Sequence, residues 1–173
     1  MYRKIIVCID DTPLSEKVAL AGADLARRYS AEVVLLSVLD PARFARQPYS
    51  GLEAVQMLDR NSRSLSNRAH RLSALLDSMG VRSQQVLVPG RSVETILNVA
   101  ETESADLIVI GTEARGRLHA WLDNDLWSQV SHKAPCNVLR VTPLGRIEED
   151  RNSDTPARPS GLRGLLSAPM SAL

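Results

Sequence analysis

The chain has 173 residues, of which 44% are hydrophobic and 24% are charged, a composition typical of a globular protein with one buried core. Lysine and arginine number 21 against 20 aspartate and glutamate residues, so the formal net charge is +1. This balance excludes a general attraction to nucleic acid or anionic membranes, and no apolar run suits a membrane span or an export signal. We therefore expect a cytoplasmic protein with no nucleic-acid or membrane partner.

The first half of the chain alternates short apolar runs with amphipathic segments. Residues 4–10 (KIIVCID) predict a strand buried on both faces, and Pro13 suits the first turn of the helix that follows. Residues 31–40 (AEVVLLSVLD) predict a second buried strand. After a loop that contains proline and arginine, the apolar positions from about 52 to 79 follow the period of a long amphipathic helix.

The second half of the chain continues the same alternation. Residues 81–90 (VRSQQVLVPG) predict a third strand and residues 92–104 (SVETILNVAETES) a helix. The apolar residues 105–111 (ADLIVIG) predict a fourth strand. A short helix at about 127–133 then precedes a fifth strand at 136–142.

Five strands that alternate with helices indicate right-handed crossovers and a mostly parallel sheet. The predicted fold is therefore a doubly wound α/β domain over residues 1–144, Rossmann-like, with five strands and helices on both faces. From residue 145 to 173 the chain becomes polar and rich in proline, so we expect a flexible C-terminal tail.

Ligands of such sheets bind outside the carboxyl ends of the strands, where the strand order reverses. The candidate residues at these strand ends are Cys8, Ile9, Asp10, Val38, Val88, Gly90, Ile110 and Gly111. Asp10 can bind ribose hydroxyls or a cation, or it can cap the first helix, and the sequence leaves these roles open. Cys8 and Cys136 lie in apolar runs without the spacing of metal ligands, so we expect reduced thiols and no metal site.

Motifs of several enzyme classes are missing from the sequence. There is no G-x-G-x-x-G after the first strand, no G-x-x-x-x-G-K-[ST], and no G-x-S-x-G nucleophile elbow. We therefore expect no catalytic residues and no enzymatic activity.

Over about residues 1–143 the chain resembles the universal stress protein family. Its first 40 residues, with Asp10 at the first strand end, are similar to the opening of that family. The stretches ADLIVIGTEARG (105–116) and APCNVLRV (134–141) are similar to its fourth and closing strands. The resemblance implies a fold like that of the adenine nucleotide alpha hydrolases and a role in stress response or regulation.

ATP-binding members of this family carry G-x-x-G, nine residues and then G-[ST] after the fourth strand, where glycines admit phosphate to backbone N–H groups. Here those positions hold Gly111, Ala114, Asn124 and Asp125, and Leu126 follows. Asp125 places an anion where a donor would meet phosphate, and like charges about 4 Å apart repel by roughly 1 to 4 kcal/mol. We expect a degenerate loop with weak or no binding of adenine nucleotide.

Alternatives to this interpretation stay open. Asp123 and Asp125 can hold a cation that bridges to phosphate, or they can cap the helix that follows them. The rival function is a sensor that binds AMP or ATP and regulates a partner protein. Its adenosine contacts would come from Cys8, Asp10, Val38, Val88 and Gly111.

The final strand predicts how the chain assembles. As the last strand of an open sheet it would leave unpaired N–H and C=O groups at an edge, and related proteins pair such strands across a two-fold axis. We expect a homodimer whose contact centres on residues 138–141, Val138 to Val141. The alternative is a monomer whose edge is protected by Arg140 and Pro143.

Overall fold

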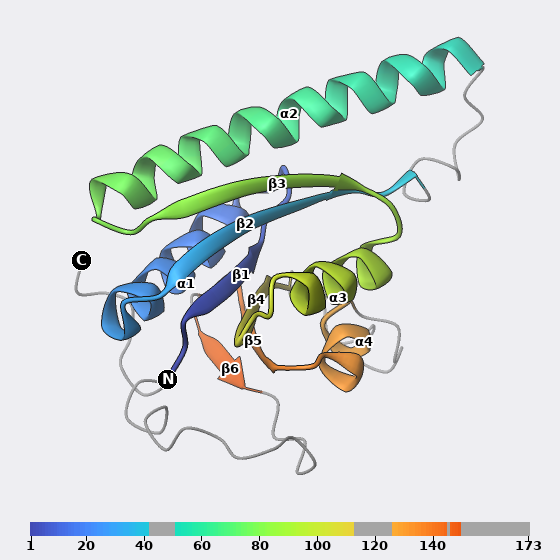
Figure 1. Ribbon diagram of the computed structural model, residues 1–173. Helices are drawn as coiled ribbons and strands as arrows, with labels where there is room; N and C mark the ends of the chain where they lie inside the picture. Colours follow the sequence, from blue (N-terminus) through green and yellow to red (C-terminus); the bar gives the residue numbers. More distant parts are fainter. Residues whose placement is uncertain (42–50, 113–125, 145, 150–173) are drawn as a thin grey trace.

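The computed structural model describes residues 1–41, 51–112, 126–144 and 146–149. Its helices and strands alternate along the chain (Figure 1). They are β1 (Lys4–Cys8), α1 (Leu14–Tyr29), β2 (Glu32–Leu39), α2 (Gly51–Ser78), β3 (Ser83–Pro89), α3 (Ser92–Thr102), β4 (Leu107–Gly111), α4 (Leu126–Lys133), β5 (Asn137–Val141) and β6 (Ile147–Glu149).

The strands form one sheet in the order β3-β2-β1-β4-β5-β6. β1 to β5 are parallel, which confirms the predicted α/β fold, and β6 runs antiparallel to β5. The chain first adds strands outward from β1 to β3 and then crosses to the other side of β1. The strand order therefore reverses between β1 and β4, and that point is where sheets of this kind bind ligands.

Helices cover both faces of the sheet (Figure 1). On the face of α1 and α2, the core contains Val7, Val18 and Leu76, and on the face of α3 and α4 it contains Ile6, Ile96 and Val130. The side chains of β1 alternate between these two cores because successive residues of a strand point to opposite faces. A strand buried on both sides must be apolar throughout, and this explains the sequence of β1 and of β4.

The carboxyl-terminal edge differs from the sequence-based expectation. β6 lies inside the segment predicted to be a flexible tail, and it pairs with β5 through Leu139↔Glu149 and Val141↔Ile147. Ile147 also packs against the core on the α1 face. The expectation that Val138 to Val141 form a free sheet edge is therefore wrong, because the chain turns back and covers that edge itself.

Smaller differences concern the ends of the helices. α1 begins at Leu14, and Pro13 occupies the capping position without a side-chain hydrogen bond. α4 begins at Leu126, one residue before the predicted start. None of the helices in the described part of the chain combines the length and apolar composition that a bilayer crossing requires.

Candidate ligand site at the strand ends

A pocket opens at the reversal point of the sheet. Cys8 of β1 is the register partner of Leu36 on one side and of Ile110 on the other, and all three side chains contribute to the core on the α3 face. The described residues that line the pocket are Cys8, Ile9, Asp10, Thr12, Leu14, Ser15, Val18, Leu36, Val38, Ser92, Ile96, Ile110, Gly111 and Leu126. Its walls are mostly aliphatic, with polar groups at the entrance to α1 and α3.

The structure brings together most of the residues named from the sequence. Those that line the pocket are Cys8, Ile9, Asp10, Val38, Ile110, Gly111 and Leu126. Val88 and Gly90, at the end of the outer strand β3, are not among the lining residues. Ala114, Asn124 and Asp125 lie outside the described residues, as does Asp123.

Sequence reasoning missed the contributions of the helices and of one strand residue. Ser15 and Val18 come from the first turns of α1, and Ser92 and Ile96 from those of α3. Leu36 could have been found, because it precedes Val38 by two residues and so shares its face of β2. The helix residues depend on how each helix crosses the sheet, which the sequence pattern does not specify.

Asp10 organises the start of α1. Its Oδ1 accepts hydrogen bonds from the backbone N–H of Thr12 at 3.0 Å, from Thr12 Oγ1 at 2.7 Å and from Ser15 Oγ at 2.6 Å. The backbone N–H of Asp10 donates to Ser15 Oγ at 2.7 Å. Asp10 therefore bonds the residue that leads into α1 and the side chain of Ser15, but it does not cap the helix, because it accepts no backbone N–H of α1. These bonds hold its carboxylate at the pocket.

A second carboxylate fixes the start of α3. Asp40, just after β2, accepts hydrogen bonds at Oδ2 from the backbone N–H of Ser92 at 2.9 Å and from Ser92 Oγ at 2.8 Å. The capping residue itself, Arg91, makes no side-chain cap. Asp40 thus satisfies one of the N–H groups that a helix leaves open at its first turn, and it holds Ser92 at the pocket wall.

The thiol at the pocket is protonated at neutral pH. Burial raises the pKa of Cys8 to about 12, with a smaller contribution from nearby Cys136. Burial, and then the Asp106 carboxylate, raise the pKa of Cys136 to about 11. Both cysteines are free and half-buried. Because the thiolate is the nucleophilic form, neither group is activated for covalent chemistry.

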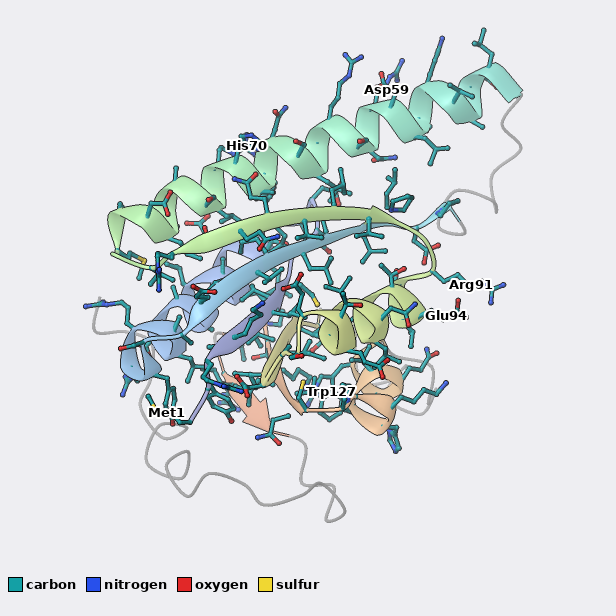
Figure 2. The ribbon with its side chains drawn as sticks, in the orientation of Figure 1. Met1, Asp59, His70, Arg91, Glu94 and Trp127 are labelled. Atoms are coloured by element: carbon teal, nitrogen blue, oxygen red, sulfur yellow. The ribbon has the colours of Figure 1, made fainter. Side chains whose placement is uncertain are left out.

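An arginine stands beside the pocket on the neighbouring strand. Arg140 of β5 is the register partner of the lining residue Ile110. Its guanidinium carbon lies 4.7 Å from the ring centre of Trp127. Trp127, which is labelled in Figure 2, follows the lining residue Leu126 at the start of α4. The sequence suggested that Arg140 protects an exposed edge of the sheet. In the structure its side chain lies against the aromatic ring of Trp127.

Metal ligands do not gather in the described ranges. Among residues 1–41, 51–112, 126–144 and 146–149 there is no group of three or more His, Cys, Asp or Glu side chains suited to hold a metal ion. The cation considered for Asp123 and Asp125 concerns residues outside these ranges.

Comparison with known proteins extends from the fold to the family. The family model of the universal stress protein family matches residues 1–142. The chain belongs to the universal stress protein family. Universal stress protein MJ0531 of Methanocaldococcus jannaschii is 26% identical over 143 residues, covering 82% of each chain.

Solved structures of universal stress proteins share the fold. UspA from Lactobacillus plantarum superposes with a TM-score of 0.68 at 20% identity, over 80% of this chain and 97% of that one. A universal stress protein in complex with cAMP superposes with a TM-score of 0.62 at 17% identity, over 81% of this chain and 97% of that one. At these identities the structural similarity establishes the fold alone. The ligand is inferred from the residues that line the pocket.

Proposed function

We propose that this universal stress protein is a non-catalytic regulatory protein that binds the adenosine part of a nucleotide in the strand-end pocket and holds ATP only weakly. The observation that carries the proposal is the lining of the pocket. Leu36, Val38 and Ile96 offer an apolar slot for a flat base, and Asp10 and Ser92 place polar groups at its edge.

The charges at the pocket and in the sequence after β4 favour a nucleoside or a monophosphate over ATP. The described lining residues include the carboxylate of Asp10 and no lysine or arginine. The loop after β4 has Ala114, Asn124 and Asp125 where the ATP-binding pattern of the family has glycines and a hydroxyl. A triphosphate would therefore meet negative charge and few donors, whereas a nucleoside or a monophosphate would be repelled less. The cyclic monophosphate bound by one structural relative is of this smaller kind.

The side chains at the pocket support a binding role over catalysis. Cys8 is a protonated thiol, because its pKa is raised to about 12 by burial, so it is a poor nucleophile. Asp10 is occupied by the donors of Thr12 and Ser15 at the start of α1. Regulation would then act through a partner protein that senses the occupied or empty pocket. Free thiols fit a cytoplasmic location, which is part of the proposal.

We also propose that the protein forms a homodimer through β5, as expected from the sequence. β6 covers that edge, so pairing between two copies must compete with pairing inside one chain. The resulting dimer would be weaker than one formed by a bare strand.

Calorimetric titration with adenosine, AMP and Mg²⁺–ATP tests the nucleotide proposal. We expect measurable binding of adenosine and AMP, and a dissociation constant for ATP no tighter than about 100 μM. Low-micromolar binding of ATP would overturn the degenerate-loop proposal. Absence of adenosine binding at millimolar concentration would overturn the pocket assignment.

Alkylation of the two thiols at alkaline pH, where the thiolate fraction is larger, provides a readout of where the ligand lies. Cys8 lines the pocket and Cys136 does not, so bound adenosine should slow the reaction of Cys8 with a maleimide while leaving Cys136 unchanged. Cys136 serves as the internal control. Equal protection of both thiols would indicate a general effect on stability in place of a ligand in this pocket.

A further inference from the structure

Arg140 places a positive charge on an apolar face of the sheet. Val138, two residues earlier on β5, packs with Ile108 and Ile110 in the core beneath α3 and α4. Alternate residues of a strand share a face, so Arg140 lies on that same side. Its Nε atom is buried. Burying part of a guanidinium costs free energy that its contacts in the protein must offset.

Trp127 holds this guanidinium in place. The Arg140 guanidinium carbon is 4.7 Å from the centre of the indole ring, within the range of a cation–π interaction. Trp127 belongs to the first turn of α4, so the helix sets the position of the ring (Figure 2). The contact with the ring therefore favours one position of the guanidinium.

The Arg140–Trp127 pair borders the pocket on the β4 side. Arg140 and Val141 are the register partners of Ile110 and Gly111, both of which line the pocket. Leu126, the residue before Trp127, lines it as well. These residues lie on the β4 side of the pocket, across β1 from Leu36 and Val38 of β2.

A second arginine near the pocket offers a contrast. Arg91 precedes the lining residue Ser92, but its side chain is 77% exposed and lies 3.7 Å from the Glu94 carboxylate (Figure 2). Charges exposed in this way contribute little to binding because water and salt screen them. Arg140 is half-buried and lies against the Trp127 ring, so water and salt screen its charge less than that of Arg91.

We propose that Arg140, positioned by Trp127, binds the anionic group of the ligand and selects a singly phosphorylated nucleotide over the nucleoside. The planar guanidinium offers paired donors that match phosphate oxygens, and a single guanidinium suits a single phosphate group. This inference rests on the proposed function, because it assigns the phosphate end of the same pocket.

The test compares AMP with adenosine by calorimetry on the full chain and its variants. In the wild type we expect AMP to bind about tenfold more tightly than adenosine, the gain due to one charge-assisted contact. Arg140→Gln should reduce that preference to about twofold or less and leave adenosine binding unchanged. Trp127→Leu should reduce the preference too, because the guanidinium loses its support. Arg91→Gln is the matched control, with the same change of charge, and should retain the full preference.

The outcomes separate this inference from the proposed function. If the wild type binds no adenosine, the pocket assignment itself fails. If adenosine binds but Arg140→Gln keeps the full preference for AMP, or if Arg91→Gln loses it equally, the role assigned to Arg140 is wrong. Should Arg140→Gln fail to fold by circular dichroism, Arg140→Lys replaces it. A severalfold loss of the AMP preference in Arg140→Lys supports the inference, and an unchanged preference overturns it.

Discussion

The thiol of Cys8 couples the stability of the domain to pH. Burial raises its pKa from 9.0 to about 12, so the folded chain keeps a proton that the unfolded chain releases above about pH 9. Stability from this group is therefore complete below pH 9 and declines as the pH rises toward 12. For one thiol, the free energy of unfolding falls by at most about 1.4 kcal/mol per pH unit.

Replacing the thiol should flatten that decline. We expect urea unfolding of the wild type to show a larger loss of stability between pH 8 and pH 10 than unfolding of Cys8→Ala. Cys136→Ala should also reduce the loss, because the folded-state pKa of Cys136 is raised to about 11. Each variant is compared with itself at pH 8, which removes any effect of the substitution on packing. Equal losses in the wild type and Cys8→Ala would contradict a protonated thiol in the folded state.

At the scale of elements, two glycines set how closely α1 approaches the sheet. A Cβ atom on Gly22 would collide with Cγ2 of Val7, and one on Gly111 would lie 2.7 Å from Cγ2 of Val18. Val7 and Val18 are themselves buried in the core. The absence of side chains at Gly22 and Gly111 is therefore what allows α1 to lie against β1 and the end of β4.

The substitution Gly22→Ala should weaken this contact. We expect a loss of about 1 to 3 kcal/mol in the free energy of unfolding, since valine has few rotamers with which to avoid the added methyl group. Gly51→Ala is the control, because no atom of the described residues lies within 4 Å of a Cβ built there. That variant should match or slightly exceed the wild type, since alanine favours helix. Urea unfolding measures both, and equal stability of the two variants would show that the close approach is not required.

The elements differ in how far the sequence predicts them. β1 and β4 are apolar throughout because they are buried on both faces, so their sequences alone identify them. The sequence also predicts that Asp10 and Gly111 lie at one edge of the sheet, because parallel strands end on the same side. β6 was missed because Ile147 is its one apolar residue, too little to form a pattern.

The contact between Arg140 and Trp127 could not be predicted from the sequence. The two residues are neighbours because α4 packs against β5. No regular spacing in the sequence predicts such a contact. The sequence therefore predicts the strand ends that line the pocket, but not that Arg140 lies beside them.

At the scale of the whole molecule, the sheet ends in β3 on one side and β6 on the other. β6 is held by its pairing with β5 and by the packing of Ile147 on the core. Lys17 Nζ donates a hydrogen bond at 2.5 Å to the carbonyl oxygen of Pro143, which lies between β5 and β6. With three residues β6 is a short cap, and short edge strands discourage pairing between sheets.

Removing this cap should strengthen self-association. A chain that ends at Pro143 leaves the backbone groups of β5 unpaired, so we expect it to dimerise at lower concentration than the full chain. A chain that ends at Glu149 keeps β6 and is the matched control, which should behave like the full chain. Sedimentation velocity over a micromolar concentration series measures the difference. The same dimerisation constant for all three chains would refute the competition between β6 and a second copy.

The direction of β6 also determines where attachments can be made to the protein. β1 to β5 run toward the pocket, whereas β6 runs away from it, so that Glu149 is level with Leu139 in the interior of β5. The polypeptide thus leaves the sheet heading for the face opposite the ligand mouth. A fluorophore or an immobilisation tag fused directly after Glu149 would start out directed away from the pocket, so a chain that ends there can be attached to a sensor surface with the pocket facing the solution.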